Sequence, residues 1–199
     1  MSLFGRSWGQ KISGEVLMHG KPVDVSSIPK ATKAGLAYVT EDRKTYGLVL
    51  IDHIKHNTTL ANLPGVSSRG VVDEMQELKV ANKYRKDLKI RSSGVFQTTM
   101  NLSGGNQQKV VLAKWLARNP RVVVLDEPTR GIDVGARSSI YEIIRDLAAD
   151  GRSVIVVSSD LEEVLGVSHR IMVMAHGNQA GILDRSEASD VSVMELATA

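Results

Sequence analysis

Runs of Val, Ile and Leu alternate with amphipathic stretches through the second half of the chain. Three runs are almost wholly apolar, which is typical of strands buried on both faces of a sheet; they span residues 122–126, 154–158 and 171–175. Three stretches beside them repeat apolar positions at helical spacing, over residues 104–118, 134–149 and 161–165. This alternation predicts an α/β fold, with a mostly parallel sheet that is covered by helices on both faces.

The first half of the chain shows different patterns. Residues 14–25 alternate apolar and polar positions around His19-Gly20, which predicts a small antiparallel hairpin, and residues 36–40 form a brief strand. Residues 48–99 break into helical pieces separated by turns, with Asp73 placed to cap one helix. We therefore expect a partial core with the hairpin at 1–47, a helical subdomain at 48–100 and the rest of the core at 101–199.

Composition narrows the class of protein further. The 199 residues are 42% hydrophobic, enough for one sizeable core, and Lys plus Arg exceed Asp plus Glu by only 25 − 22 = 3. The absence of cysteine excludes disulfides and thiolate chemistry. The longest apolar runs are far shorter than the roughly 20 residues of a membrane-spanning helix. A basic run over residues 79–91 is interpreted as a solvated helix face, so we expect no nucleic-acid partner.

Two carboxylates follow the first predicted buried strand. Asp126 and Glu127 come after four apolar residues, at the carboxyl end of the strand, where open α/β sheets place their ligands. Asp126 is predicted to hold Mg²⁺, and Glu127 to polarise the water that attacks a γ-phosphate, which is the positioning work of phosphoryl transfer. A solvated acidic turn is the alternative, and the apolar strand with the following Pro128-Thr129 argues against it.

A Ser-Gly-Gly sequence opens the helix predicted over residues 104–118. Ser103 is placed to cap this helix, and Gly104 and Gly105 allow a phosphate to approach the backbone N–H groups. We therefore predict an anion site at this turn, to which Ser103 adds a hydroxyl donor. An ordinary Ser-Gly-Gly loop is the alternative, and the acidic strand that follows at this spacing disfavours it.

One element of a nucleotide site is missing from the sequence. No stretch fits G-x-x-x-x-G-K-[ST], the loop whose N–H groups and lysine surround the phosphates of ATP. A chain that keeps the later motifs without this loop is interpreted as a truncated piece or as a degenerate partner domain.

In this order, the motifs resemble those of the nucleotide-binding domain of ABC transporters. Leu102 to Gln108 resembles the signature sequence, Val122 to Glu127 the Walker B strand, and Gly131-Ile132-Asp133 the D-loop. Residues 40–44 and 128–136 further resemble the C-terminal ATPase domain of the tandem subunits that energise bacterial monosaccharide importers. The resemblance covers nearly the whole chain and implies an incomplete RecA-like P-loop ATPase core, with a helical subdomain and a small antiparallel β element. It implies ATP and Mg²⁺ as cofactors.

The resemblance also implies where nucleotide lies and which residues contact it. Each ATP lies between two domains, and the signature of one completes the site of the other. The expected nucleotide contacts are Leu102, Ser103, Gly104, Gly105, Gln107 and Asp133, with Asp126 and Glu41 at the metal and Glu127 and Ser159 in catalysis. Glu41 stands where the family has a glutamine, and Ser159 where it has a histidine. We therefore expect this domain mainly to complete its sister domain's site, while its own site hydrolyses slowly or regulates.

Partners follow from the same resemblance. They are the sister ATPase domain of the tandem subunit, transmembrane permease subunits and, indirectly, a periplasmic sugar-binding protein. The ATPase subunit itself would lie at the cytoplasmic face of the bacterial inner membrane.

Two alternative functions stay open. One is a non-catalytic module that docks on membrane subunits through its helical insert; the other is a non-transport ABC ATPase of DNA repair, which the lack of sustained heptads disfavours.

The missing loop has a structural consequence in such a fold. The Walker A strand of the family lies between the strands that correspond here to 154–158 and 171–175. Its absence would leave unpaired backbone groups, which cost about 1–3 kcal/mol each when buried. We expect that the gap closes by direct pairing, is filled by Phe4 to Ile12 or by another chain, or leaves a loosened sheet.

Overall fold

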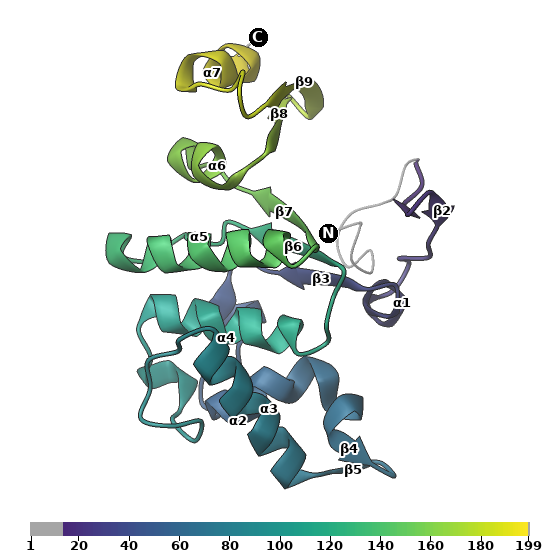
Figure 1. The fold of residues 1–199 in the computed structure, drawn as a ribbon, viewed down its shortest axis with the longest axis vertical. Helices are drawn as coiled ribbons and strands as arrows, with labels where there is room; N and C mark the ends of the chain where they lie inside the picture. The colour runs from purple at the N-terminus through teal and green to yellow at the C-terminus, as the bar shows by residue number, and fades with distance from the viewer. Residues whose placement is uncertain (1–13, 199) are drawn as a thin grey trace. The chain divides into compact units, whose positions relative to one another are not determined.

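The computed structural model describes residues 14–198, coloured from purple to yellow in Figure 1. The fold divides into two compact units, the first ending at Ile155 and the second beginning at Val156. The boundaries predicted after residues 47 and 100 both fall inside the first unit. The segment from Phe4 to Ile12, predicted as a possible filler of the sheet, lies outside the described residues.

The central sheet of the first unit positions the acidic residues. Its strand order is β3-β6-β7, and the strands are β3 (Leu36–Val39), β6 (Val122–Asp126) and β7 (Ser153–Val157). β3 and β6 run parallel, with Leu36 opposite Val122, as the apolar runs predict. Val39, Val123 and Leu125 are fully buried. Because the two strands are parallel, Glu41, just after β3, and Asp126, the last residue of β6, lie at the same edge of the sheet.

Two hairpins turn on the same dipeptide, His-Gly. β1 (Leu17–Met18) and β2 (Lys21–Pro22) are joined by His19-Gly20, and β8 (Arg170–Ala175) and β9 (Asn178–Asp184) by His176-Gly177. The turn residues have φ of 51° and 74° in the first hairpin, and 50° and 79° in the second. Positive φ at both positions suits a two-residue turn whose twist matches that of the strands.

The first hairpin confirms the prediction, whereas the second corrects one. The run at 171–175 was predicted as part of a parallel sheet, but β8 pairs antiparallel with β9. The reason is local, because the two-residue His176-Gly177 turn returns the chain directly beside β8. Among residues 14–198, β7 and β8 belong to different sheets, so the predicted direct pairing of these strands is not found there.

The helical insert lies between β3 and α4 in the chain. It contains α2 (Ile54–Thr59), the 3-10 segment η2 (Leu60–Val66) and α3 (Glu74–Asp87), with the small hairpin of β4 (Ser67–Ser68) and β5 (Val71–Val72) between them. Asp73 caps α3 as predicted, accepting hydrogen bonds from the N–H groups of Met75 and Gln76 at 3.0 and 3.1 Å. α2 contacts both α3 and α4.

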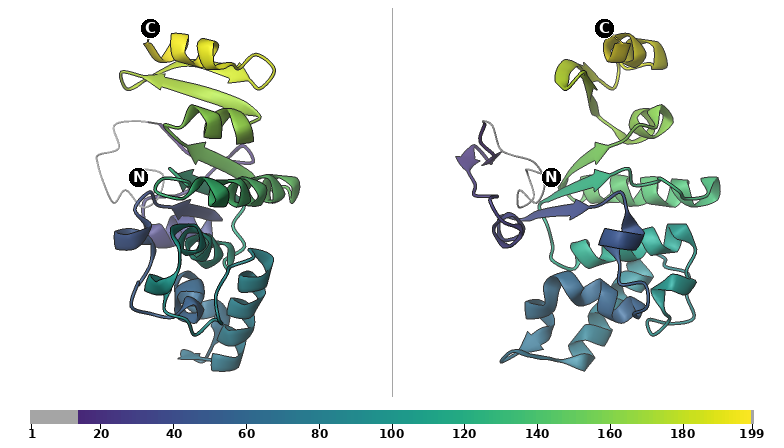
Figure 2. Two further views of the ribbon diagram at one scale, coloured as in Figure 1. Left: turned by 90° about the vertical axis from the view of Figure 1, so that its left-hand side faces the viewer. Right: turned by 180° about the vertical axis from the view of Figure 1, so that it is seen from behind.

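α4 (Gly104–Leu116) connects the helical insert to the sheet. It contacts α2 on the insert, β3 in the sheet and α5 (Val134–Ala149), as the views in Figures 1 and 2 show. The helix is buried along almost its whole length, and residues 110–113 have no exposed surface. Near its end, Trp115 joins the cluster of Val25, Ala31 and Leu36 that supports the first hairpin and α1 (Ile28–Lys33).

The second unit has a small core of its own. The β8–β9 hairpin packs with α6 (Leu161–Val167) and α7 (Asp190–Thr198) around Ile171, Val173, Ala188 and Val193. Within residues 14–198, the structure shows no helix of the length and hydrophobicity that crossing a membrane requires.

Candidate nucleotide site

Asp126 ends β6 and is held by the neighbouring strand. The phenol of Tyr38 on β3 donates a hydrogen bond to Asp126 Oδ2 at 2.5 Å. Burial, together with this bond to a carboxylate, raises the pKa of Tyr38, so the phenol keeps its proton and stays a donor. Carboxylate oxygens are the ligands that Mg²⁺ prefers. The donor set at this edge therefore fits the predicted magnesium role of Asp126.

Glu127 has an unusual backbone conformation. Its φ is 45°, in the left-handed region that non-glycine residues rarely occupy. The turn that follows is closed by the N–H of Arg130, which donates to the carbonyl of Glu127 at 3.1 Å. Such conformations persist where the surrounding structure imposes them, and they concentrate at functional sites. The second carboxylate of the site therefore leaves the strand at a sharp turn.

The segment after β3 is tied to the segment after Glu127. Glu41 forms an ion pair with Arg130, and the Arg43 guanidinium donates to the carbonyls of Arg130 and Gly131 at 2.9 and 3.0 Å. Asp42 fixes the start of η1 (Arg43–Gly47) by accepting from the N–H groups of Lys44 and Thr45, both at 3.0 Å. Glu41 and Arg43 thus tie the segment after β3 to the start of the D-loop, while Asp42 holds the start of η1.

Ser103 precedes α4 in N-cap geometry, but its side chain does not cap the helix, which corrects the prediction. Its hydroxyl oxygen accepts a hydrogen bond from Asn106 Nδ2 at 2.9 Å. The Asn106 side chain thereby supplies the donor that a backbone N–H of α4 would supply in a capped helix. Ser103 is exposed, and the first N–H groups of any α-helix have no acceptor within the helix. The turn therefore presents a hydroxyl beside the amide donors at the start of α4.

Gly104 and Gly105 stand where a side chain would collide. A Cβ on Gly104 would lie 2.9 Å from Arg43 Nη2 and 3.2 Å from the carbonyl oxygen of Gly131. A Cβ on Gly105 would lie 2.6 Å from the Cβ of Ala136 on α5. The glycines therefore let the signature turn pack directly on the D-loop and on the start of α5.

The other predicted contacts lie around this turn. Leu102 and Gln107 are buried, and Gln107 Nε2 donates to the carbonyl of Thr99 in the 3-10 turn η3 (Thr99–Asn101) at 3.1 Å. Asp133 caps α5 by accepting from the N–H of Ala136 at 2.9 Å. Ser159 follows β7 in the second unit, before α6. The first unit thus holds all the predicted site residues except Ser159.

Sequence reasoning missed two positioning residues, Tyr38 and Arg43. Both lie in the segment that was recognised as a strand followed by a charged cluster, but their partners are 88 and 87 residues away. For Tyr38, the only available signal was a phenol on the strand predicted at residues 36–40, which could pair with the strand that ends at Asp126. Nothing in the local pattern indicates that Arg43 binds the D-loop carbonyls.

A parallel strand pair, one strand of which leads into two carboxylates, and a Ser-Gly-Gly helix start packed on the loop that follows them fit the ATP-binding cassette fold. The family model for the ABC transporter matches residues 4–130, which is more than half of the chain. The chain belongs to this family.

Relatives with known roles match the whole chain. The L-arabinose transport ATP-binding protein AraG of Geobacillus stearothermophilus is 50% identical, over 100% of this chain and 39% of its own length. The xylose import ATP-binding protein XylG of Geobacillus kaustophilus is 47% identical, over 99% and 39%. The chain thus spans about two fifths of the length of these relatives.

Solved structures bear out the fold. The ATP-binding cassette MJ1267 in its ADP conformation superposes with a TM-score of 0.77 at 21% identity, over 98% of this chain and 79% of that one. The dimeric cassette MJ0796 with ADP and phosphate gives 0.71 at 23% identity, over 87% and 74%. The predicted RecA-like P-loop class is therefore confirmed.

Proposed function

We propose that this chain is the C-terminal ATPase domain of the ATP-binding subunit of a bacterial monosaccharide importer. Relatives named for arabinose, xylose and ribose import match it over 94% or more of its length. The substrate of the whole subunit would be a sugar of this class, with ATP hydrolysis driving uptake. Turnover by the full-length subunit separates this proposal from a non-catalytic module.

The signature turn carries the proposal through its exposed residue Ser103. Ser103 presents its hydroxyl to solvent beside the first amides of α4, and the packing of Gly104 and Gly105 fixes the turn on the D-loop. Helix N-termini with a hydroxyl neighbour bind phosphate. The domain would thus donate hydrogen bonds to a γ-phosphate that is held by its sister domain.

The acidic edge of the sheet has a separate role in this proposal. Asp126, oriented by Tyr38, and Glu41 would hold Mg²⁺, which neutralises the charge of the phosphates. Glu127 would orient the attacking water, and Ser159 would replace the usual imidazole contact. Glu41 stands where the family has a glutamine, and it pairs with Arg130. This face would therefore hydrolyse slowly or regulate.

A comparison of two substitutions in the tandem subunit tests the division of roles. We expect Ser103→Ala to lower the ATPase rate by about a hundredfold, as loss of a phosphate-stabilising donor does, and Glu127→Gln to lower it much less. Ser138→Ala on the exposed side of α5 is the matched control and should leave the rate unchanged. Equal losses for Ser103→Ala and Glu127→Gln, or a reversed order, would refute the proposal.

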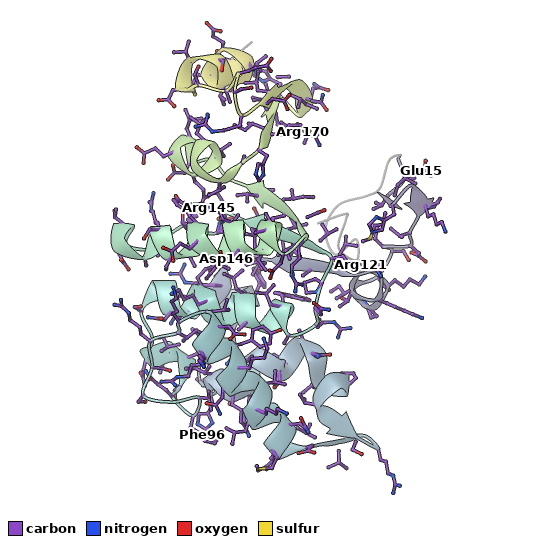
Figure 3. All side chains as sticks on the ribbon, viewed as in Figure 1. Glu15, Phe96, Arg121, Arg145, Asp146 and Arg170 are labelled. Carbon is purple, nitrogen blue, oxygen red and sulfur yellow. The ribbon has the colours of Figure 1, made fainter. Side chains whose placement is uncertain are left out.

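Three exposed apolar side chains in the helical insert support docking on permease subunits at the cytoplasmic face of the membrane. Ile51, Phe96 and Met100 are 82%, 59% and 57% exposed, and Figure 3 shows Phe96 at the edge of the insert. The two segments lie side by side, because the N–H of Met100 donates to the carbonyl of Leu50 at 2.9 Å. We refer to these three side chains as the insert patch.

A charge placed in the insert patch tests the docking. Phe96→Glu should abolish co-purification of the subunit with its permease, because the apolar contact would bury a carboxylate. Met75→Glu, at a residue on α3 that is 74% exposed, is the control and should co-purify normally. The periplasmic sugar-binding protein would then contact the permease alone.

A further inference from the structure

Three metal-ligating side chains converge at the start of α2, apart from the nucleotide site. One candidate ligand atom from each of Asp52, His53 and His56 lies within 4.8 Å of the others. Histidine nitrogens with a carboxylate oxygen suit zinc, nickel and cobalt, whereas Mg²⁺ prefers oxygen ligands alone. We propose that these residues form a binding site for a divalent transition metal of the Zn²⁺ class.

The spacing of two of the ligands is already close to what a metal requires. His56 Nδ1 lies 2.7 Å from Asp52 Oδ1. Two atoms that are each about 2.1 Å from the same zinc ion are about 3–3.5 Å apart in ordinary coordination angles. An ion therefore enters this pair once the two atoms separate by about 0.3–0.8 Å and the proton between them leaves. His56 then carries its ring proton on Nε2.

A buried carboxylate stands on the far side of the His56 ring. Glu77 Oε2 is 3.9 Å from His56 Nε2, and Glu77 itself is fixed by Lys55 Nζ at 2.9 Å and by the Thr59 hydroxyl at 2.7 Å. A carboxylate behind a histidine ligand favours the tautomer that leaves the other nitrogen for the metal, and it strengthens that ligand. At 3.9 Å the Glu77 oxygen is beyond hydrogen-bond distance, so it acts on the His56 ring through its charge.

Backbone hydrogen bonds hold the ligand segment against the loop at residues 95–99. The N–H of Ile54 donates to the carbonyl of Gln97 at 3.1 Å, and the N–H of Thr99 donates to the carbonyl of Asp52 at 2.9 Å. The His53 ring meets the Phe96 ring edge-on, with centroids 6.0 Å apart. These contacts fix the backbone of the ligand segment at the start of α2.

The site is open enough for an ion to enter. The side chains of Asp52 and His56 are 37% and 44% exposed. Three protein ligands leave a fourth tetrahedral position for water or for a ligand from a partner. His53 contacts Phe96 of the insert patch, so a bound ion would stand beside the surface proposed to meet the permease.

Calorimetric titration of the tag-free chain with Zn²⁺ tests the site. We expect one ion per chain, with the affinity lowered at least about tenfold in His56→Gln and in His53→Gln. His169→Gln removes a histidine outside the cluster and should bind as the unmodified chain does. Co²⁺ should give a visible absorption band that the two cluster variants lose.

Circular dichroism of the metal-free variants distinguishes the loss of a metal ligand from the loss of the fold. His56→Gln and His53→Gln leave every backbone hydrogen bond of the segment possible, so their spectra should match that of the unmodified chain. Weaker Zn²⁺ binding by a variant with an unchanged spectrum supports the site. Absence of Zn²⁺ binding by the unmodified chain, or unchanged affinity in the folded double variant His53→Gln with His56→Gln, would overturn the proposal.

Discussion

At the scale of single residues, Arg43 connects loops that are 87 residues apart in the chain. Its guanidinium donates to the carbonyls of Arg130 and Gly131, and its Nη2 lies beside Gly104. Burial lowers the pKa of Arg43, yet a guanidinium stays charged at any ordinary pH. One side chain therefore holds the D-loop next to the signature turn.

We expect Arg43→Lys to lower the free energy of unfolding by about 1–3 kcal/mol, because one ammonium cannot replace a fork that satisfies two carbonyls. Urea denaturation followed by circular dichroism measures the change. Lys44→Ala alters the exposed neighbour and should leave the midpoint in place. If Arg43→Lys and the unmodified chain unfolded at the same urea concentration, the D-loop would not depend on this fork.

Lys114 provides a second residue-scale prediction, which concerns pH. Its ammonium donates to the carbonyl of Gly47 at 2.5 Å, and burial lowers the pKa of Lys114 from 10.5 to about 8. Below pH 8 the folded and unfolded chains both carry the charge, so the cost of burying it is fully present. Between about pH 8 and 10.5 the unfolded chain binds more protons, so the free energy of unfolding rises with pH.

The rise attributable to Lys114 should approach about 3 kcal/mol across this window. Lys114→Met removes the titrating group, so only the unmodified chain should gain this stability. The unfolding free energy of the variant minus that of the unmodified chain should therefore fall by that amount from pH 8 to 10.5. Denaturation at a series of pH values measures it. A difference that is independent of pH would show that burial does not shift this lysine.

At the scale of elements, the contact between the starts of α4 and α5 sets how the signature turn packs. A Cβ on Gly105 would lie 2.6 Å from the Cβ of Ala136, which is closer than two carbon atoms can approach. The helices can therefore meet only because one of the facing positions has no side chain.

Gly105→Ala should lower the free energy of unfolding by about 1–3 kcal/mol, as overpacking does. Adding Ala136→Gly should restore part of this loss, because it moves the missing methyl group to the other helix. Gly94→Ala, where nothing lies within 4 Å, should have little effect. Strictly additive losses for the two substitutions in a double-mutant cycle would contradict direct contact.

At the scale of the whole molecule, the chain combines a complete signature turn and acidic strand with no phosphate-wrapping loop in its sequence. We expect the chain alone to bind Mg-ATP more weakly than a Kd of about 1 mM, because isolated phosphate contacts at a helix start contribute little. Isothermal titration calorimetry measures this directly. Saturable binding at micromolar ATP would show that the chain holds nucleotide by itself.

Local patterns predicted much of this fold correctly. The bounds of β6 and α5 agree with the prediction, and the first hairpin forms around His19-Gly20 as expected. These elements depend on periodicity, capping and turn chemistry, all of which act within a few residues. The second His-Gly turn carried the same signal, and β9 was missed because the apolar run before it was assigned to the parallel sheet.

The sequence by itself determined the order of the motifs and the strands and helices that carry them, such as β3, β6, α4 and α5, because short-range periodicity encodes those elements. Tertiary structure alone decided that Arg43 binds the D-loop carbonyls, that Tyr38 holds Asp126, and that Gly105 faces Ala136. Each of these pairs joins residues from separate elements. Their contacts arise only when the packing of α4, α5 and the sheet fixes distances that no local pattern specifies.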